Sequence, residues 1–173
     1  LAVGDKVLDA AALLHHLLKI EPAERPAVIA KALPVLLPDY PQSHAGLAAQ
    51  ALSILANPDL QNLFGPGSRG ELPILARGTK NGAPITIAGR IDRLVVELGK
   101  VTIVDYKSDA AVPEDAEAVP NAYLTQLGLY AAIAGLIFPG QAVDAKILWT
   151  SRESLMNLPV GLLRKATLGF TIG

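Results

Sequence analysis

The chain has 173 residues, contains no cysteine, carries a formal net charge of -1 and is 51% hydrophobic. This composition favours one globular domain of the α+β type, long enough to bury a core without disulfides. The absence of cysteine excludes an iron–sulfur cluster and a thiol nucleophile. The near-neutral charge is not typical of a domain that binds nucleic acid unaided, because such binding depends on neutralising phosphates.

The sequence offers no membrane or export signal. No uncharged apolar run reaches the roughly eighteen residues of a membrane span, and charges and histidines interrupt Leu1–Ile20 too often for a signal peptide. We therefore expect no membrane association. The chain starts at a leucine rather than a methionine, so we expect it to be a piece of a longer protein.

Three stretches in the first third of the chain predict helices from their apolar content and bounding prolines: Leu8–Ile20, Pro26–Leu37 and His44–Ala56. We expect a bend or stop at Pro34 and an N-cap at Ser43. His15 and His16 lie in the first helix, which is apolar on most faces. A histidine in such a helix is more often a hydrogen-bonded core residue than a ligand, and the residues alone leave both open.

Strands are expected after the loop of residues 64–70, whose glycines lack the strand-before, helix-after setting of a phosphate-binding loop. Glu71–Arg77 predicts a strand, Lys80–Gly82 a turn, and Ala83 the start of a longer strand. With the strand that follows, these predict a three-stranded antiparallel meander. Glu71 could reach the charged residues of the hairpin that follows in the chain, but at one end of its strand, beside a loop, it is more simply expected to face solvent.

A β-hairpin is predicted next. The β-branched runs Ile91–Glu97 and Val101–Lys107 are joined across Leu98-Gly99, where glycine supplies the positive φ of a tight turn. If the loop has two residues, the register places Asp92 directly opposite Asp105 on the same face. Side chains in such pairs lie about 4.5 to 5.5 Å apart at Cβ, where two carboxylates repel unless a cation or a shared proton lies between them.

Lys107 follows Asp105 by two residues and therefore leaves the strand on the same face. Two facing carboxylates and an ammonium suit a hard cation with oxygen ligands and a reacting anion beside it. The alternative is an ordinary solvated face of a half-exposed hairpin. Val104 and Tyr106 alternate with the charged residues and confine them to one face, which favours a site.

The rest of the chain predicts a crossover. Ser108–Pro120 is an acidic, proline-punctuated loop, Asn121 is expected to cap a helix over Ala122–Ile137, and Ala142–Thr150 alternates as a fourth strand. A right-handed crossover would make this strand parallel to one of the central pair. Ser151–Gly173 is weakly patterned.

One polar stripe marks the predicted helix after the loop. Tyr123, Gln126 and Tyr130 fall on one side of it, among leucine, alanine and isoleucine. The stripe is either functional, or two tyrosines at the rim of the core with an exposed glutamine between them.

The motifs together resemble a known family. G-R-I-D-R-L, I-V-D-Y-K-S-D and Y-x-x-Q-x-x-x-Y are similar to those of the RecB-type nucleases in the PD-(D/E)XK superfamily. The neighbouring L-L-H-H-L-L, I-F-P-G and I-L-W-T are most similar to the C-terminal nuclease domain of bacterial AddA, a helicase–nuclease subunit. The resemblance covers roughly His15–Trp149. It implies an α/β, restriction-endonuclease-like core with a mixed sheet of about four to five strands flanked by helices, preceded by a helical segment.

The resemblance assigns the catalytic centre. The family's motif aspartate corresponds to Asp92 and its D-x-K pair to Asp105 and Lys107. The family's upstream histidine ligand best matches His15, with His16 as the alternative. Asp92, Asp105, a backbone carbonyl near Tyr106 and His15 would then hold Mg²⁺, for which Mn²⁺ could substitute. Lys107 would position or deprotonate the attacking water.

The resemblance also assigns residues around that centre. Gln126 and Tyr130 match the Q-x-x-x-Y motif and would orient the DNA backbone or the lysine, with Tyr123 commonly alongside. Arg90 and Arg93 flank the motif aspartate, and one of them could hold a phosphate.

The implied function is a metal-dependent deoxyribonuclease, an exonuclease that hydrolyses phosphodiesters during double-strand break repair by recombination. Its partners would be single-stranded DNA ends, a helicase domain of the same polypeptide that feeds them, and an AddB-like subunit, in the bacterial cytoplasm. The tether to a motor would explain how a domain of charge -1 meets DNA, through effective concentration.

We expect a single nuclease domain over residues 1–173, with a helical segment at 1–64, a catalytic core at 71–150 and a C-terminal extension at 151–173. Two alternatives stay open. One is an inactive nuclease-like module that braces a partner subunit or guides DNA, although such a module has no need of a repelling carboxylate pair. The other is a small-molecule metallohydrolase, for which the sequence shows no apolar pocket pattern.

Overall fold

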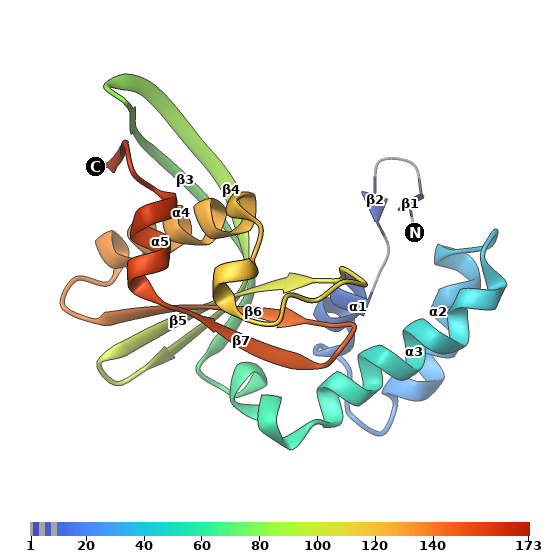
Figure 1. Ribbon diagram of the computed structural model, residues 1–173. Coiled ribbons are helices and arrows are strands. Elements are labelled where there is room, and N and C mark those ends of the chain that lie inside the picture. The colour runs from blue at the N-terminus through green and yellow to red at the C-terminus, as the bar shows by residue number, and fades with distance from the viewer. Residues whose placement is uncertain (1, 4–5, 8–9) are drawn as a thin grey trace. The chain divides into compact units, whose positions relative to one another are not determined.

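The computed structural model describes residues 2–3, 6–7 and 10–173 (Figure 1). The chain forms two compact units, each built from three segments. The first unit comprises Leu1–Phe64, Tyr106–Val112 and Trp149–Ser154, and the second comprises Gly65–Asp105, Pro113–Leu148 and Leu155–Gly173. In the part of the chain that the structure describes, no helix is both long and apolar enough to cross a membrane.

The first unit is mainly helical. Its elements are β1 (Ala2–Val3), β2 (Lys6–Val7), α1 (Ala10–Leu17), α2 (Arg25–Leu36), α3 (Pro41–Ala56) and the 3₁₀ helix η1 (Pro58–Phe64). Leu14, Leu33 and Ile54 are almost completely buried and form the centre of its core. Arg25 Nε donates to the carbonyl oxygens of Leu17 (3.0 Å) and Ile20 (3.1 Å), which satisfies groups at the end of α1.

The three predicted helices exist, with corrected ends. Residues 8–9 of the first prediction lie outside the described residues, and α1 ends at Leu17 rather than Ile20. α2 continues through Pro34 to Leu36. The predicted N-cap at Ser43 is wrong, because α3 already begins at Pro41. The fixed φ of proline suits the first helical position, where its missing N–H costs nothing.

The larger sheet has six strands in the order β7-β6-β5-β4-β3-β8. The strands are β3 (Ser68–Lys80), β4 (Ala83–Glu97), β5 (Lys100–Lys107), β6 (Ala142–Trp149), β7 (Ser154–Leu158) and β8 (Phe170–Ile172). The other elements of this half of the chain are the 3₁₀ helix η2 (Ala116–Ala118), α4 (Asn121–Ile137) and α5 (Val160–Ala166). The predicted mixed α/β core is therefore confirmed.

Two tight turns set the registers of the meander. Asn81 (φ 51°) and Gly82 (φ 83°) join β3 to β4, and Lys80 pairs with Ala83. Leu98-Gly99 joins β4 to β5, with Gly99 at φ 75°. Both turns need positive φ, which asparagine and glycine supply cheaply. The predicted two-residue hairpin loop is confirmed.

β6 runs parallel to β5, as expected from the predicted crossover connection. The amide of Ala142 donates to the carbonyl of Gly99 (3.0 Å), and the amide of Thr150 donates to that of Lys107 (2.9 Å). From the first of these bonds to the second, both strands advance by the same number of residues and in the same direction, so the two strands are parallel. α4 connects them and begins at Asn121, with Pro120 rather than Asn121 at the N-cap.

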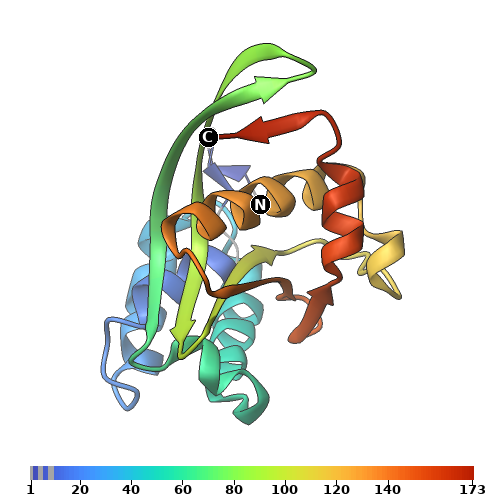
Figure 2. The same ribbon diagram turned by 90° about the vertical axis from the view of Figure 1, so that its left-hand side faces the viewer.

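The weakly patterned C-terminal stretch supplies β7, α5 and β8, so the sheet has more strands than the four to five expected. β8 pairs antiparallel with the far end of β3, from Gly78↔Ile172 to Lys80↔Phe170 (Figure 2). β3 itself begins at Ser68, inside the predicted loop of residues 64–70.

Candidate active site

Asp92 and Asp105 lie on neighbouring strands, as predicted. β4 and β5 pair from Glu97↔Lys100 to Arg93↔Val104, and the next step of this register aligns Asp92 with Asp105. Asp105 is only 4% exposed and its Oδ2 atom is buried, whereas Asp92 is half-buried. Asp105 therefore places an acid inside an apolar central strand, where a charged carboxylate is stable only if it is hydrogen-bonded or near a cation.

Glu71 stands in the same row, which is the less favoured of the two positions that the sequence left open for it. The pairs Gly70↔Arg93 and Leu72↔Ile91 bracket Glu71, so the β3–β4 register aligns it with Asp92. Its backbone has φ 52°, a conformation that costs a non-glycine residue of order 1–3 kcal/mol. The side chain is 38% exposed and Oε1 lies 3.1 Å from Nη1 of Arg90, so Glu71 is not simply solvent-facing. Counting back from the Asn81-Gly82 turn would have revealed this alignment.

The two arginines that flank Asp92 differ in environment. Arg93 is 7% exposed, and its Nη1 donates to Ser68 Oγ at 3.0 Å. A Cβ at Gly70 would lie 3.0 Å from Arg93 Nη2, so the guanidinium lies across β3. The Arg90 side chain is 62% exposed. Arg90 is thus the accessible arginine of the two, while Arg93 ties β4 to β3.

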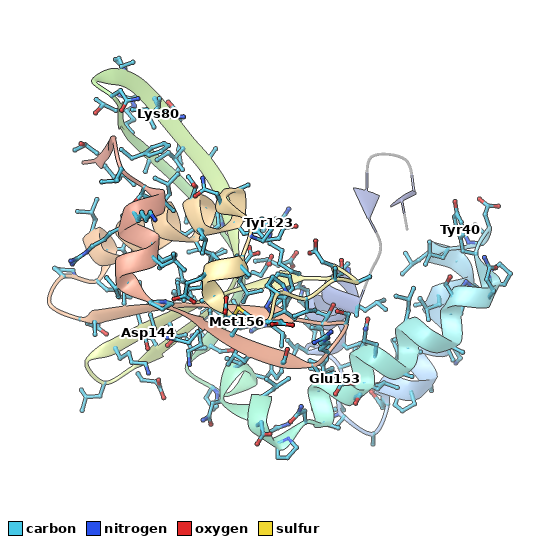
Figure 3. The ribbon with its side chains drawn as sticks, in the orientation of Figure 1. Tyr40, Lys80, Tyr123, Asp144, Glu153 and Met156 are labelled. Carbon is cyan, nitrogen blue, oxygen red and sulfur yellow. The ribbon has the colours of Figure 1, made fainter. Side chains whose placement is uncertain are left out.

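The Q-x-x-x-Y pair packs against β4. Gln126 Nε2 donates to the hydroxyl of Tyr130 at 3.3 Å. Tyr130 is 7% exposed, and its ring lies against Gly89: a Cβ there would be 2.9 Å from Cζ and closer still to the hydroxyl. Tyr123 lies one turn before Gln126 on α4 and is half-buried (Figure 3). The close approach explains why the residue three before Asp92 is a glycine.

In the first unit, the structure separates the two candidate histidines. The imidazole of His15 stacks on the ring of Tyr106, with 5.3 Å between ring centroids and 25° between planes. Tyr106 is the middle residue of the D-x-K segment. His16 is exposed and lines an apolar pocket of about 520 Å³ between α1 and α2. Of the two, His15 is the one that contacts the D-x-K segment.

Lys107 ends β5 and its backbone is held firmly. Its carbonyl oxygen accepts from the amide (2.9 Å) and the hydroxyl (3.3 Å) of Thr150, which is completely buried. Two bonds to one carbonyl fix the direction of the chain at the lysine, whose side chain is half-exposed.

Side chains alone do not complete a metal site. Across residues 2–3, 6–7 and 10–173, no three histidine, aspartate or glutamate side chains are grouped closely enough to hold an ion. Asp92 and Asp105 nevertheless fit Mg²⁺, which binds through one or two carboxylates and keeps several waters. Backbone carbonyl oxygens add further hard ligands.

Comparison with known proteins defines the class. A model of the PD-(D/E)XK nuclease superfamily matches residues 4–158, and the chain belongs to this superfamily. None of the curated proteins matches the chain. A solved structure of a candidate exonuclease from Eubacterium rectale is similar, with 15% identity and a TM-score of 0.46 over 94% of this chain and 64% of that one. The structure of SSO0001 has 14% identity and a TM-score of 0.37 over 96% of this chain and 77% of that one.

Proposed function

We propose that the chain is a metal-dependent deoxyribonuclease that hydrolyses phosphodiester bonds in DNA, acting as an exonuclease. The alignment of Asp92 with buried Asp105 supports this most directly. Membership of the nuclease superfamily adds to it, because the D-x-K pair then has a known kind of task. In the sequence, both carboxylates and Lys107 match the family's motif residues, which supports the proposal.

Asp92, Asp105 and the carbonyl of Tyr106 would hold Mg²⁺. The family resemblance adds His15 as a further ligand, which the structure does not group with the two carboxylates among the described residues. When bound, the ion lowers the pKa of a coordinated water and offsets charge that develops on the scissile phosphate. Titration calorimetry with Mn²⁺ tests the histidine: His15→Ala should weaken binding about tenfold or more, and His16→Ala should not. Equal affinities of the two variants would remove His15 from the ligand set.

The other residues act on substrate and water. Lys107 would position the attacking water or accept its proton, and its charge would offset the transition-state anion. Arg90, exposed beside Asp92, would hold a neighbouring phosphate. Gln126 and Tyr130 would act indirectly, because their contacts hold α4 on β4 close to Asp92.

Asp105→Asn tests the proposal, because it keeps shape and removes charge. We expect Mg²⁺-dependent cleavage of single-stranded DNA to fall at least about a hundredfold, since several kcal/mol of metal-based stabilisation correspond to two or more powers of ten. Asp144→Asn is the matched control: it breaks only a surface pair with Lys100 at 3.2 Å and should retain activity.

The stability of the same variant separates a ligand from a structural group. Without metal, the melting temperature of Asp105→Asn should be unchanged or higher, because repulsion from Asp92 is relieved. A clear drop would make Asp105 a structural partner. Undiminished cleavage would refute the site, and an inactive wild-type chain that binds metal would favour a module that only braces a partner or guides DNA.

We further propose that the chain works within an AddA-like helicase–nuclease in double-strand break repair by recombination, with an AddB-like subunit, in the bacterial cytoplasm. The motif sequences support this proposal. The net charge of -1 supports it as well, because a domain with weak affinity of its own for DNA can act when a tethered motor supplies DNA at high effective concentration. Fusion to such a motor should lower the KM for DNA and leave kcat unchanged. An unchanged KM would count against the tether.

A further inference from the structure

The outer β3–β4 ribbon, residues 73–80 and 83–90, has one open face. The pairs Pro73↔Arg90 and Arg77↔Thr86 set its register, and alternation places every second side chain on the same side. The side chains on this open face are Pro73, Leu75, Arg77, Thr79, Pro84, Thr86, Ala88 and Arg90. All are exposed except Thr79, which is half-buried, and Leu75 is 75% exposed.

The opposite face of the ribbon is covered. Ile74 is buried, Ile85 and Ile87 are half-buried, and Gly89 is in contact with Tyr130 of α4. At the tip, Lys80 Nζ lies 5.1 Å from the centre of the Phe170 ring on β8 (Figure 3). α4 and β8 therefore support the ribbon, while the open face is presented to solvent.

The open face is basic and has no acid. It carries Arg77 and Arg90, and residues 72–91 contain no aspartate or glutamate, in a chain whose net charge is -1. Hydroxyl groups of Thr79 and Thr86 lie among the cations. Guanidinium and hydroxyl groups donate hydrogen bonds to phosphate oxygens, and exposed leucine and proline side chains offer contacts for sugars and bases.

The open face leads to the carboxylates. Asp92 follows Arg90 by two residues and shares its side of β4, about 7 Å further along. Arg77 lies opposite Thr86, so the two arginines are roughly 13 Å apart along the strand and would contact different phosphates. Glu71 uses one donor of Arg90, and a guanidinium has five.

We propose that the open face of the outer β3–β4 ribbon binds a single DNA strand and guides it to Asp92. The inference rests on the proposed nuclease function for the position of the scissile phosphate. A single strand fits better than a duplex, because two cations on a narrow ribbon neutralise few phosphates, and exposed Leu75 offers an apolar contact to unpaired bases.

Binding of a labelled ~20-nucleotide single strand, in EDTA and at several salt concentrations, tests this without cleavage. Arg77→Glu should raise Kd about tenfold and reduce the salt slope by about 0.7 for each phosphate that is no longer neutralised. Lys165→Glu makes the same charge change at an exposed residue of α5, which packs against α4 on the covered side of the ribbon, and should shift Kd less than about twofold. Thr86→Glu adds a carboxylate opposite Arg77 and should also weaken binding.

Several results would overturn the inference. They are equal Kd values for Arg77→Glu and Lys165→Glu, tighter binding of a duplex of the same length, or no binding of a single strand at low salt by the wild-type chain. Circular dichroism of each variant excludes misfolding as the cause. If binding depends on Arg77 but the chain cleaves no DNA in Mg²⁺, the proposal for the ribbon stands and the proposed nuclease function is refuted. If the chain cleaves DNA but binding does not depend on Arg77, the nuclease function stands and the proposal for the ribbon is refuted.

Discussion

The two halves of β4 differ in burial and in the number of strands that they pair with. The inner half, Ile91–Glu97, pairs with β3 on one side and with β5 on the other, and four of its seven residues are buried. The outer half, Ala83–Arg90, pairs with β3 and contains no buried residue. Asp92 lies next to the boundary between them. One strand thus joins a fixed chemical centre to an accessible surface.

Different forces hold the two halves. In the inner half, neighbours on both sides fix the backbone, so two carboxylates can be kept opposite each other despite their repulsion. In the outer half the support comes from one side, through α4 at Gly89 and β8 at the tip. Substitutions that loosen this support should harm the site from a distance, whereas those on the open face should affect only binding.

Gly89→Ala should have one of the two largest effects on stability. The new methyl group would overlap the phenol of Tyr130, and overpacking of this kind costs about 1–3 kcal/mol. We expect urea denaturation to show this loss, and Gly89→Ala combined with Tyr130→Leu to recover part of it. Additive losses in the double variant would mean that the two residues do not depend on each other.

Arg93→Gln should come next. It removes the charge-assisted bond to Ser68 within a buried environment, which costs about 1.5–3 kcal/mol. Because Arg93 ties β4 to β3 beside Asp92, Mn²⁺ affinity measured by calorimetry should fall together with the free energy of unfolding. Unchanged stability with weaker DNA binding would instead return Arg93 to the role of a phosphate ligand.

The hairpin was predictable because its information is local. A two-residue turn with glycine sets the register, and the register alone aligns Asp92 with Asp105. The β3–β4 turn carries equal information about Glu71, but the pairing has to be extended along most of β3 to reach that residue. The sequence therefore left two positions open for Glu71, near the site or facing solvent. Strand ends depend on contacts beyond the strand, which is why they were missed.

Non-local contacts could not be predicted. β8 has three residues, and only its pairing with β3 makes it a strand. The stacking of His15 on Tyr106 joins segments some ninety residues apart in sequence and depends on tertiary packing. The proximity of Gly89 to Tyr130 is similar, although an isolated glycine inside a strand pattern does signal a close approach.

Arg90→Gln should have the smallest effect on stability and the sharpest contrast with Arg93→Gln. Its pair with Glu71 is at the surface, so the free energy of unfolding should fall by less than about 1 kcal/mol. Single-strand binding in EDTA should nevertheless weaken, with a salt slope reduced by about 0.7. Equal stability losses at Arg90 and Arg93 would mean that the division of β4 into a fixed half and an accessible half is wrong, because both arginines would then be structural.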